Sequence, residues 1–280
     1  MLQKMLEQTV GGVIMKKTKI EWCDSTWNPV TGCLHGCEYC YARKIARRFC
    51  SNEHGKEGLL APCNGDCKAC SNMDGLEFLL SNVRICGRGQ GSYPYGFMPT
   101  FHRYRLDEPS QWTKPRTIFV CSMADLFGEW VPDKWIEEVF EACGKAPQHR
   151  YLFLTKNPDR YCELANSGKL PKLNNFWYGT TVTNKDSKFF GGSIQYNTFI
   201  SVEPLLSSLN AGIGSFSWAK WIIIGAETGK RRNKIVPEKD WIDNICEAAN
   251  LTRAKIFMKD SLIPIVGEEN MRREFPWMED

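Results

Sequence analysis

Seven short runs of apolar residues recur along this chain, and they constrain its fold more than any other feature. Each run is continuous rather than alternating, which is typical of parallel strands buried on both faces of a sheet. Segments with helical periodicity or helix caps lie between the runs. The expected strands are residues 28–31, 117–121, 151–155, 177–183, 199–202, 221–224 and 255–258.

Two of the intervening segments have the pattern of amphipathic helices. In residues 131–143, Trp135, Val139 and Cys143 recur every fourth position and form one apolar stripe, and residues 237–250 repeat the pattern. Strands that alternate with helices form βαβ units with parallel strands. The sequence therefore predicts an α/β fold, a parallel (β/α) barrel that is whole or partial.

The chain has 280 residues, a length at which such barrels form one domain. Residues 1–14 are weakly patterned and predict an N-terminal extension, which leaves a single domain over residues 15–280. Within it, residues 50–115 are rich in Gly, Pro, Cys and Arg. This stretch is too long for a plain loop, so we expect an insertion after the first βα unit that folds around something of its own.

Composition and charge narrow the class of protein. Hydrophobic residues make up 42% and charged residues 24% of the chain, which fits a globular protein and argues against wholesale disorder. A net charge of +4 permits a phosphate-bearing partner but is too small to identify one. No apolar run reaches the length of a membrane span, and the N-terminus lacks the pattern of a secretory signal. We expect a cytoplasmic protein with no membrane partner.

Cys33, Cys37 and Cys40 follow the first expected strand with the spacing C-x3-C-x2-C. With the observed cysteine content, this spacing arises by chance on the order of 0.03 times per chain. Thiolates are ligands of zinc and of iron–sulfur clusters, and three of them can hold three corners of a cubane while the fourth iron stays open. A structural zinc site needs a fourth protein ligand, and within the loop only His35 is available. The loop favours a [4Fe–4S] cluster.

A second triplet, Cys63, Cys67 and Cys70, repeats this spacing inside the expected insertion. Nearby candidates for a fourth ligand are Cys50, Cys86 and His54. Four ligands would close either a structural zinc site or an auxiliary [4Fe–4S] cluster, and the sequence does not distinguish the two. Three free thiols are the remaining alternative.

The first cysteine loop, with Tyr39 just before its last cysteine and a barrel behind it, resembles the radical S-adenosylmethionine (SAM) superfamily. The resemblance implies a partial (β/α)6 barrel in which the open iron chelates SAM. It implies that the reduced cluster cleaves SAM to a 5′-deoxyadenosyl radical, which abstracts hydrogen from a substrate. It also implies an electron donor such as flavodoxin or ferredoxin.

A closer resemblance covers most of the chain from Ile20 onward. It is to an uncharacterised phage and prophage family with a three-cysteine motif, and it assigns no reaction. The segments that carry it are residues 20–22, 27–33, 37–42, 118–127, 147–149, 154–156, 201–205 and 223–227.

By strand count, the superfamily resemblance implies cofactor contacts at the strand ends. These are Ser122 and Asp125 for the SAM amino group, Thr181 and Thr183 on the fourth strand for the ribose, and Gly225 and Glu227 for the adenine. The Gly-Gly-Glu motif that commonly binds the amino group is absent from the sequence. Plain packing at the strand ends is the alternative for each residue.

Lys156 and Glu203 are the candidates for contact with substrate. A charged residue directly after an apolar barrel strand projects into the rim where barrel enzymes carry their chemistry. A Lys–Glu ion pair that braces the barrel is the alternative.

Basic residues also accompany aromatic ones near the cysteine loop. Arg43, Lys44, Arg47 and Arg48 form one helical face, and the insertion interleaves arginines with tyrosines and phenylalanines. Such interleaving suits a single-stranded or flipped-base ligand, whereas a solvated face beside a small aromatic core is the alternative.

The leading hypothesis is a radical SAM enzyme with an unidentified substrate, for which a nucleotide or nucleic acid is the first candidate. The competing hypothesis is a non-catalytic zinc- or iron–sulfur-binding module that binds nucleic acid or a partner protein.

Overall fold

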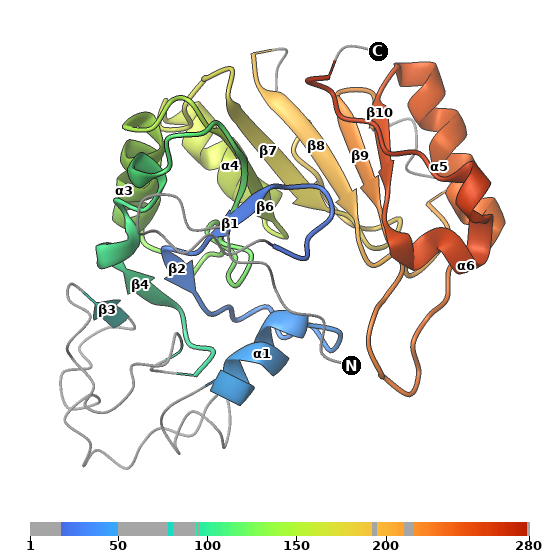
Figure 1. Cartoon of the computed structure of the whole chain (residues 1–280), viewed down its shortest axis with the longest axis horizontal. Helices are drawn as coiled ribbons and strands as arrows, with labels where there is room; N and C mark the ends of the chain where they lie inside the picture. The colour runs from blue at the N-terminus through green and yellow to red at the C-terminus, as the bar shows by residue number, and fades with distance from the viewer. Residues whose placement is uncertain are drawn as a thin grey trace.

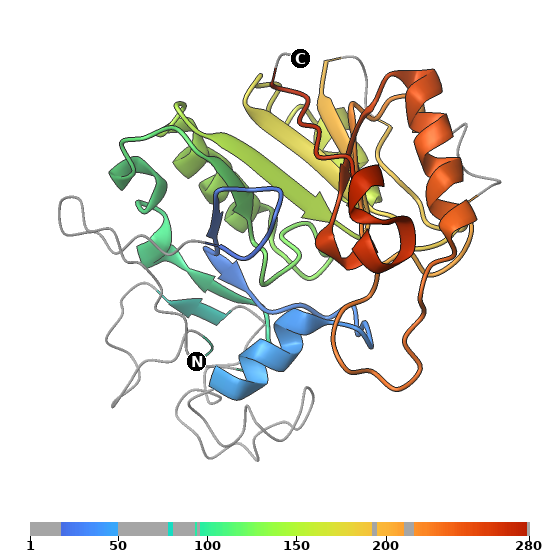
Figure 2. The same ribbon diagram turned by 45° about the vertical axis from the view of Figure 1, so that its right-hand side comes forward.

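The computed structural model describes residues 18–49, 78–80, 93, 96–191, 195–209 and 216–278. Within these ranges, seven parallel strands form one sheet that curls without closing (Figures 1 and 2). In their order across the sheet they are β1 (Ser25–Trp27), β5 (Thr117–Val120), β6 (Arg150–Thr155), β7 (Phe176–Thr181), β8 (Asn197–Val202), β9 (Trp221–Ile224) and β10 (Lys255–Met258). This confirms the partial parallel barrel, with seven strands where the superfamily resemblance implied six.

Helices cover the outer face of the curled sheet (Figure 1). Phe153 and Tyr178 point outward and pack with α3 (Asp133–Gly144) and α4 (Pro158–Asn166), whereas Ile222 and Ile224 of β9 pack against α5 (Lys239–Thr252). The two helices expected from periodicity are therefore confirmed, each displaced by one or two residues. In the described part of the chain, no helix is long and apolar enough to cross a membrane.

The inner face holds a second, largely aromatic core. Its members include Trp177, Phe199 and Trp221 from three neighbouring strands. Phe275 and Trp277 from the C-terminal segment close over it, with 5.0 Å between the ring centroids of Trp277 and Trp221. This core fills the interior near the amino ends of the strands, because further along β7 and β8 the inward positions carry only small residues.

A small second sheet lies beside the first, in the order β2 (Val30–Thr31), β4 (Thr100–His102) and β3 (Phe78–Leu80). The expectation of a first barrel strand over residues 28–31 is wrong, because the barrel strand β1 ends at Trp27. Pro29 carries no N–H for a ladder, so the chain turns there, and its carbonyl accepts a hydrogen bond of 2.7 Å from the His102 N–H. Of the expected insertion, the described residues contribute β3, β4 and two short 3-10 turns, η1 (Arg103–Arg105) and η2 (Pro109–Gln111).

His102 predicts a pH dependence of folding stability. It is fully buried, and its Nε2 lies 2.8 Å from the Thr31 hydroxyl. Burial, aided by the charge of Arg105, lowers the pKa of His102 to about 3. Below its ordinary pKa the unfolded chain binds a proton that the folded chain does not, so stability falls with falling pH. The expected slope from this group is about 1.4 kcal/mol per pH unit between roughly pH 6.5 and 3. Denaturant titrations at a series of pH values should show that the free energy of unfolding depends less steeply on pH in His102→Gln than in the wild type. An unchanged pH dependence would contradict the assignment.

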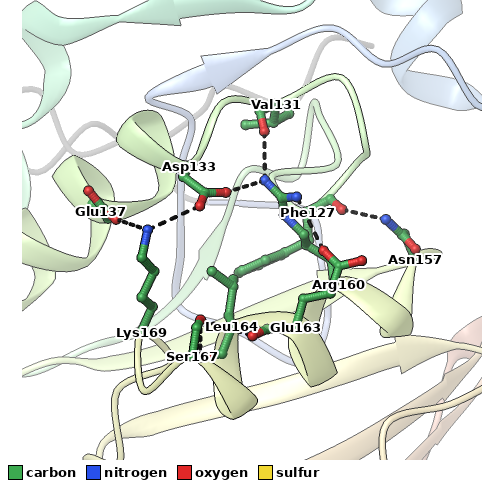
Figure 3. A network of polar contacts seen from close by, with 10 residues as sticks. All are labelled: Phe127, Val131, Asp133, Glu137, Asn157, Arg160, Glu163, Leu164, Ser167 and Lys169. Atoms are coloured by element: carbon green, nitrogen blue, oxygen red, sulfur yellow. Dashed lines mark hydrogen bonds and ion pairs between the residues drawn. The ribbon is translucent and has the colours of Figure 1, made fainter.

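Polar contacts between α3 and α4 fix the loop that follows β5 (Figure 3). The Arg160 guanidinium pairs with Asp133 and donates to the Val131 carbonyl at 3.2 Å. Asn157 donates to the Phe127 carbonyl at 3.0 Å, and Lys169 bridges Asp133 and Glu137. This network fixes the segment of residues 127–133. That segment lies just after Asp125, a central residue of the candidate site.

Candidate metal and cofactor site

The cysteine loop connects β2 to α1 (Tyr41–Phe49) and starts beside the carboxyl end of β5. The Gly32 N–H donates to the Met123 carbonyl at 2.9 Å, and the Cys33 N–H donates to the Phe97 carbonyl at 3.1 Å. Gly32 has φ +91°, and a Cβ there would lie 2.1 Å from the Met98 carbonyl oxygen. Only glycine fits this close approach, which brings the first cysteine to the sheet end.

The three cysteines of this loop are half-buried. Cys33 and Cys40 pack against the same small apolar cluster, and the Arg43 N–H at the start of α1 donates to the Cys40 sulfur at 3.4 Å. Burial, with the nearby Asp125, Cys40 and Cys37 charges, raises the pKa of Cys33 to about 12. A thiolate there therefore needs a cation beside it.

The donor set of this loop matches what an iron–sulfur cluster requires, three thiols on a short glycine-containing turn. Nothing lies within 4 Å of the position of a Cβ at Gly36, which has φ +74°, so the second half of the loop is open. As arranged across the described ranges, no three Cys, His, Asp or Glu side chains are grouped to hold a metal ion. To hold a metal centre, the thiols would therefore have to turn toward a shared point.

Asp125 ties the cysteine loop to the ends of two strands. Its carboxylate is buried and accepts four hydrogen bonds. Oδ1 accepts from the Phe127 N–H at 3.0 Å and the Thr155 hydroxyl at 2.8 Å, and Oδ2 accepts from the Lys156 N–H at 2.9 Å and His35 Nε2 at 2.7 Å. All four donors belong to the protein, and one of them, His35, lies between Cys33 and Cys37 in the loop.

Asn28 is a site residue that sequence reasoning missed. Its Oδ1 accepts hydrogen bonds from the Met123 N–H at 2.9 Å and from the Ser122 hydroxyl at 3.2 Å. The Ser122 carbonyl in turn accepts from the Tyr41 hydroxyl at 2.8 Å. Before a proline, Asn28 has the sequence signature of an ordinary turn residue, which gave no signal of this role.

The two candidates for substrate contact, Lys156 and Glu203, are not paired with each other. Lys156 Nζ lies 5.5 Å from the ring centroid of Tyr39 within the cysteine loop, and burial lowers the pKa of Lys156 below its ordinary value. Glu203 instead forms an ion pair with Lys259 at the end of β10. A Cβ at Gly225 would meet both members of that pair, at 3.0 Å from Lys259 and 3.3 Å from Glu203.

The two threonines expected on the fourth strand differ in position. Thr181 is the last residue of β7, on the same side of the strand as Trp177 and Gly179, and therefore faces the interior of the half-barrel near its carboxyl end. Thr183 lies beyond the strand, where its N–H donates to the Ser187 hydroxyl at 3.1 Å. Only Thr181 is a strand residue.

Glu227 joins the far end of the sheet to the cysteine loop. Its buried carboxylate accepts two hydrogen bonds of 2.7 Å from Arg231, whose third contact is Glu38 at 3.3 Å. Glu38 lies between Cys37 and Tyr39. The hydrogen bonds from Arg231 hold the pKa of Glu227 below its ordinary value, so the carboxylate stays ionised.

Of the residues expected to form the site, those around the first cysteine loop are connected by these contacts. The second triplet, Cys63, Cys67 and Cys70, lies outside the described residues, as do its candidate fourth ligands Cys50, Cys86 and His54. The expected N-terminal extension lies outside them as well.

Comparison with known proteins places the chain in a family. No curated protein matches it. Among solved structures, a single-site mutant of spore photoproduct lyase is similar, with a TM-score of 0.47 and 10% sequence identity over 89% of this chain and 79% of that chain. A protein family described as "Protein of unknown function (DUF5131)" matches residues 17–261, which is most of the sequence. The chain therefore belongs to the DUF5131 family.

Proposed function

We propose that this protein is a radical SAM enzyme whose [4Fe–4S] cluster is held by Cys33, Cys37 and Cys40. One observation carries the proposal: the loop with three thiols starts at the carboxyl end of a parallel half-barrel and is bonded through His35 to Asp125. In parallel α/β barrels, this end of the strands is where catalytic groups gather.

The residues present fit such a cluster. Three thiols leave one iron free for SAM, and the Arg43 N–H already donates to the Cys40 sulfur, an interaction that favours the thiolate. When bound, the cluster supplies the electron that breaks a carbon–sulfur bond of SAM.

The chain's own polar groups would bind and orient SAM. Glu227, whose charge is balanced by Arg231, would lie beside the adenine at the carboxyl end of the sheet, and Glu203, balanced by Lys259, would face the substrate. Glu203 and Lys259 fill the space that a side chain at Gly225 would need, and we propose that the adenine meets the backbone of Gly225 on its remaining open side. Thr181 faces the same interior and offers a hydroxyl to a ribose.

Lys156 and Ser122 complete the proposed site beside the cysteine loop. Lys156 brings a cation next to Tyr39, where it would favour an anionic group of SAM or substrate. Ser122 would contact the amino group of SAM.

An external electron donor of the flavodoxin or ferredoxin type would reduce the cluster. We propose either zinc or a second cluster at Cys63, Cys67 and Cys70.

Loss of one cluster ligand tests the proposal. After anaerobic reconstitution, the wild-type protein should form 5′-deoxyadenosine from SAM and dithionite, and Cys33→Ala should not. Cys162→Ala is the matched control, because Cys162 is exposed on α4 and lies away from the loop. Iron content should fall in Cys33→Ala alone, by about four atoms per chain.

Comparing iron between these variants separates the first site from any metal at the second triplet. The proposal fails if a reconstituted protein with its cluster forms no 5′-deoxyadenosine. It also fails if protein purified without oxygen contains only zinc, or if Cys33→Ala keeps full activity.

A further inference from the structure

Exposed cations flank the cysteine loop on two sides. One set lies on α1, directly after the loop, and the other lies in residues 228–236 between β9 and α5. We call the six together the cationic rim; they are Lys44, Arg47, Arg48, Lys230, Arg232 and Lys234. The two sets are more than 180 residues apart in sequence, and the fold brings them to one side of the sheet.

Arg231 fixes this arrangement. It is half-buried between its exposed neighbours and bonds Glu227 at the end of β9 to Glu38 in the cysteine loop. Figures 1 and 2 both show α1 and the loop of residues 228–236 extending from the side toward which the strands point. The rim therefore flanks the proposed site.

The cations of the rim have no carboxylate partner in the described part of the chain. Many other surface cations do pair, as Lys169 does with Glu137, Lys188 with Asp159 and Lys239 with Asp243. Like charges gathered without a counter-ion repel one another, and a bound polyanion would relieve that repulsion.

Exposed aromatic rings accompany the cations. Tyr41 and Phe49, at the two ends of α1, are 50% and 57% exposed. Bases stack on such rings while lysine and arginine side chains contact the phosphates, which is how single-stranded nucleic acid is bound. An acidic protein surface would pair with the cations, but its carboxylates would not stack on the exposed rings.

We propose that the cationic rim binds single-stranded nucleic acid and brings a nucleotide to the carboxyl end of the half-barrel. That a nucleotide is the substrate rests on the proposed function, whereas binding to the rim does not. Binding can therefore be measured with no SAM cleavage at all.

Fluorescence anisotropy with labelled oligonucleotides of about 12 nucleotides, one of DNA and one of RNA, tests the rim in the full chain. The variant Lys230→Glu/Arg232→Glu/Lys234→Glu should bind both about tenfold or more weakly, and its log–log slope of affinity against salt should be shallower by roughly 2. The control Lys114→Glu/Lys134→Glu/Lys145→Glu removes the same charge at exposed, scattered lysines and should bind as the wild type does.

Phe49→Ala should weaken binding several-fold without changing the salt slope, because it removes a ring and no charge. If the rim variant loses affinity for only one of the two oligonucleotides, the rim recognises the sugar of that oligonucleotide. The proposal is overturned if the wild type binds neither, if both triple variants lose affinity equally, or if poly-glutamate competes as well as the oligonucleotides do. Failure to form 5′-deoxyadenosine with oligonucleotide binding intact would reject the proposed function alone.

Discussion

Replacing Asp125 with Ala is expected to lower the free energy of unfolding by about 3–5 kcal/mol and to abolish cluster retention. The substitution removes the acceptor of four hydrogen bonds at a buried position. Two of the donors are backbone N–H groups, of Phe127 and Lys156, and cannot turn toward water without moving the strand ends.

A second substitution separates the loss of stability from the loss of the cluster. His35→Ala leaves the other three bonds of Asp125 in place, so it should cost much less stability while still freeing the cysteine loop. Both variants should lose iron after reconstitution, measured per chain alongside denaturant unfolding. Asp159→Ala is the control, since Asp159 is an exposed partner of Lys188 on the surface. If Asp125→Ala keeps its iron at wild-type stability, Asp125 does not anchor the loop.

Ending the chain after Glu274 is expected to lower the free energy of unfolding by about 3–5 kcal/mol. The truncation removes Phe275 and Trp277, which cover the aromatic core on the inner face. Trp277 also lies under the Arg150 guanidinium, 4.1 Å from its ring centroid. The contacts of Glu274 with Ile256 and Trp221 remain, so the loss reports on the two rings.

Thermal unfolding of a chain that ends after Met278 provides the matched control, because it removes two residues and neither ring. Its midpoint should equal that of the full chain. The double substitution Phe275→Ala/Trp277→Ala should reproduce the effect of truncation after Glu274. Equal stability of all these chains would show that the inner core does not depend on the C-terminal segment.

The parallel barrel strands could be predicted because most of them are continuous apolar runs and because two amphipathic helices, α3 and α5, lie between strands, although the described residues between β7 and β8 and between β8 and β9 form no α-helix. The first strand could not, since β1 has only three residues and two of them, Ser25 and Thr26, are polar. Nor could the sequence show which residues close the inner face. Phe275 and Trp277 follow the last helix-like segment in a stretch with no periodicity, and only the curl of the sheet brings them over Trp221.

The candidate site could be predicted from the cysteine spacing, but its supporting contacts could not. Asp125 was expected to face a cofactor, and the structure shows its four bonds directed to protein donors. A bracing Lys156–Glu203 ion pair was one alternative to substrate contact, and Glu203 pairs with Lys259 instead. Both contacts depend on how strand ends distant in sequence lie next to one another, which the spacing of residues does not encode.

The C-terminal segment has a consequence for how copies of this protein meet. A half-barrel has two free edges, and an unpaired edge strand is a template for a strand from another chain. Along β10 that template is already used, since Met258 donates to the Arg272 carbonyl and Glu274 donates to the Ile256 carbonyl, each at 2.8 Å. At the opposite edge, β1 offers only three residues. The sheet therefore cannot be extended at β10 by a second copy, although it never closes on itself.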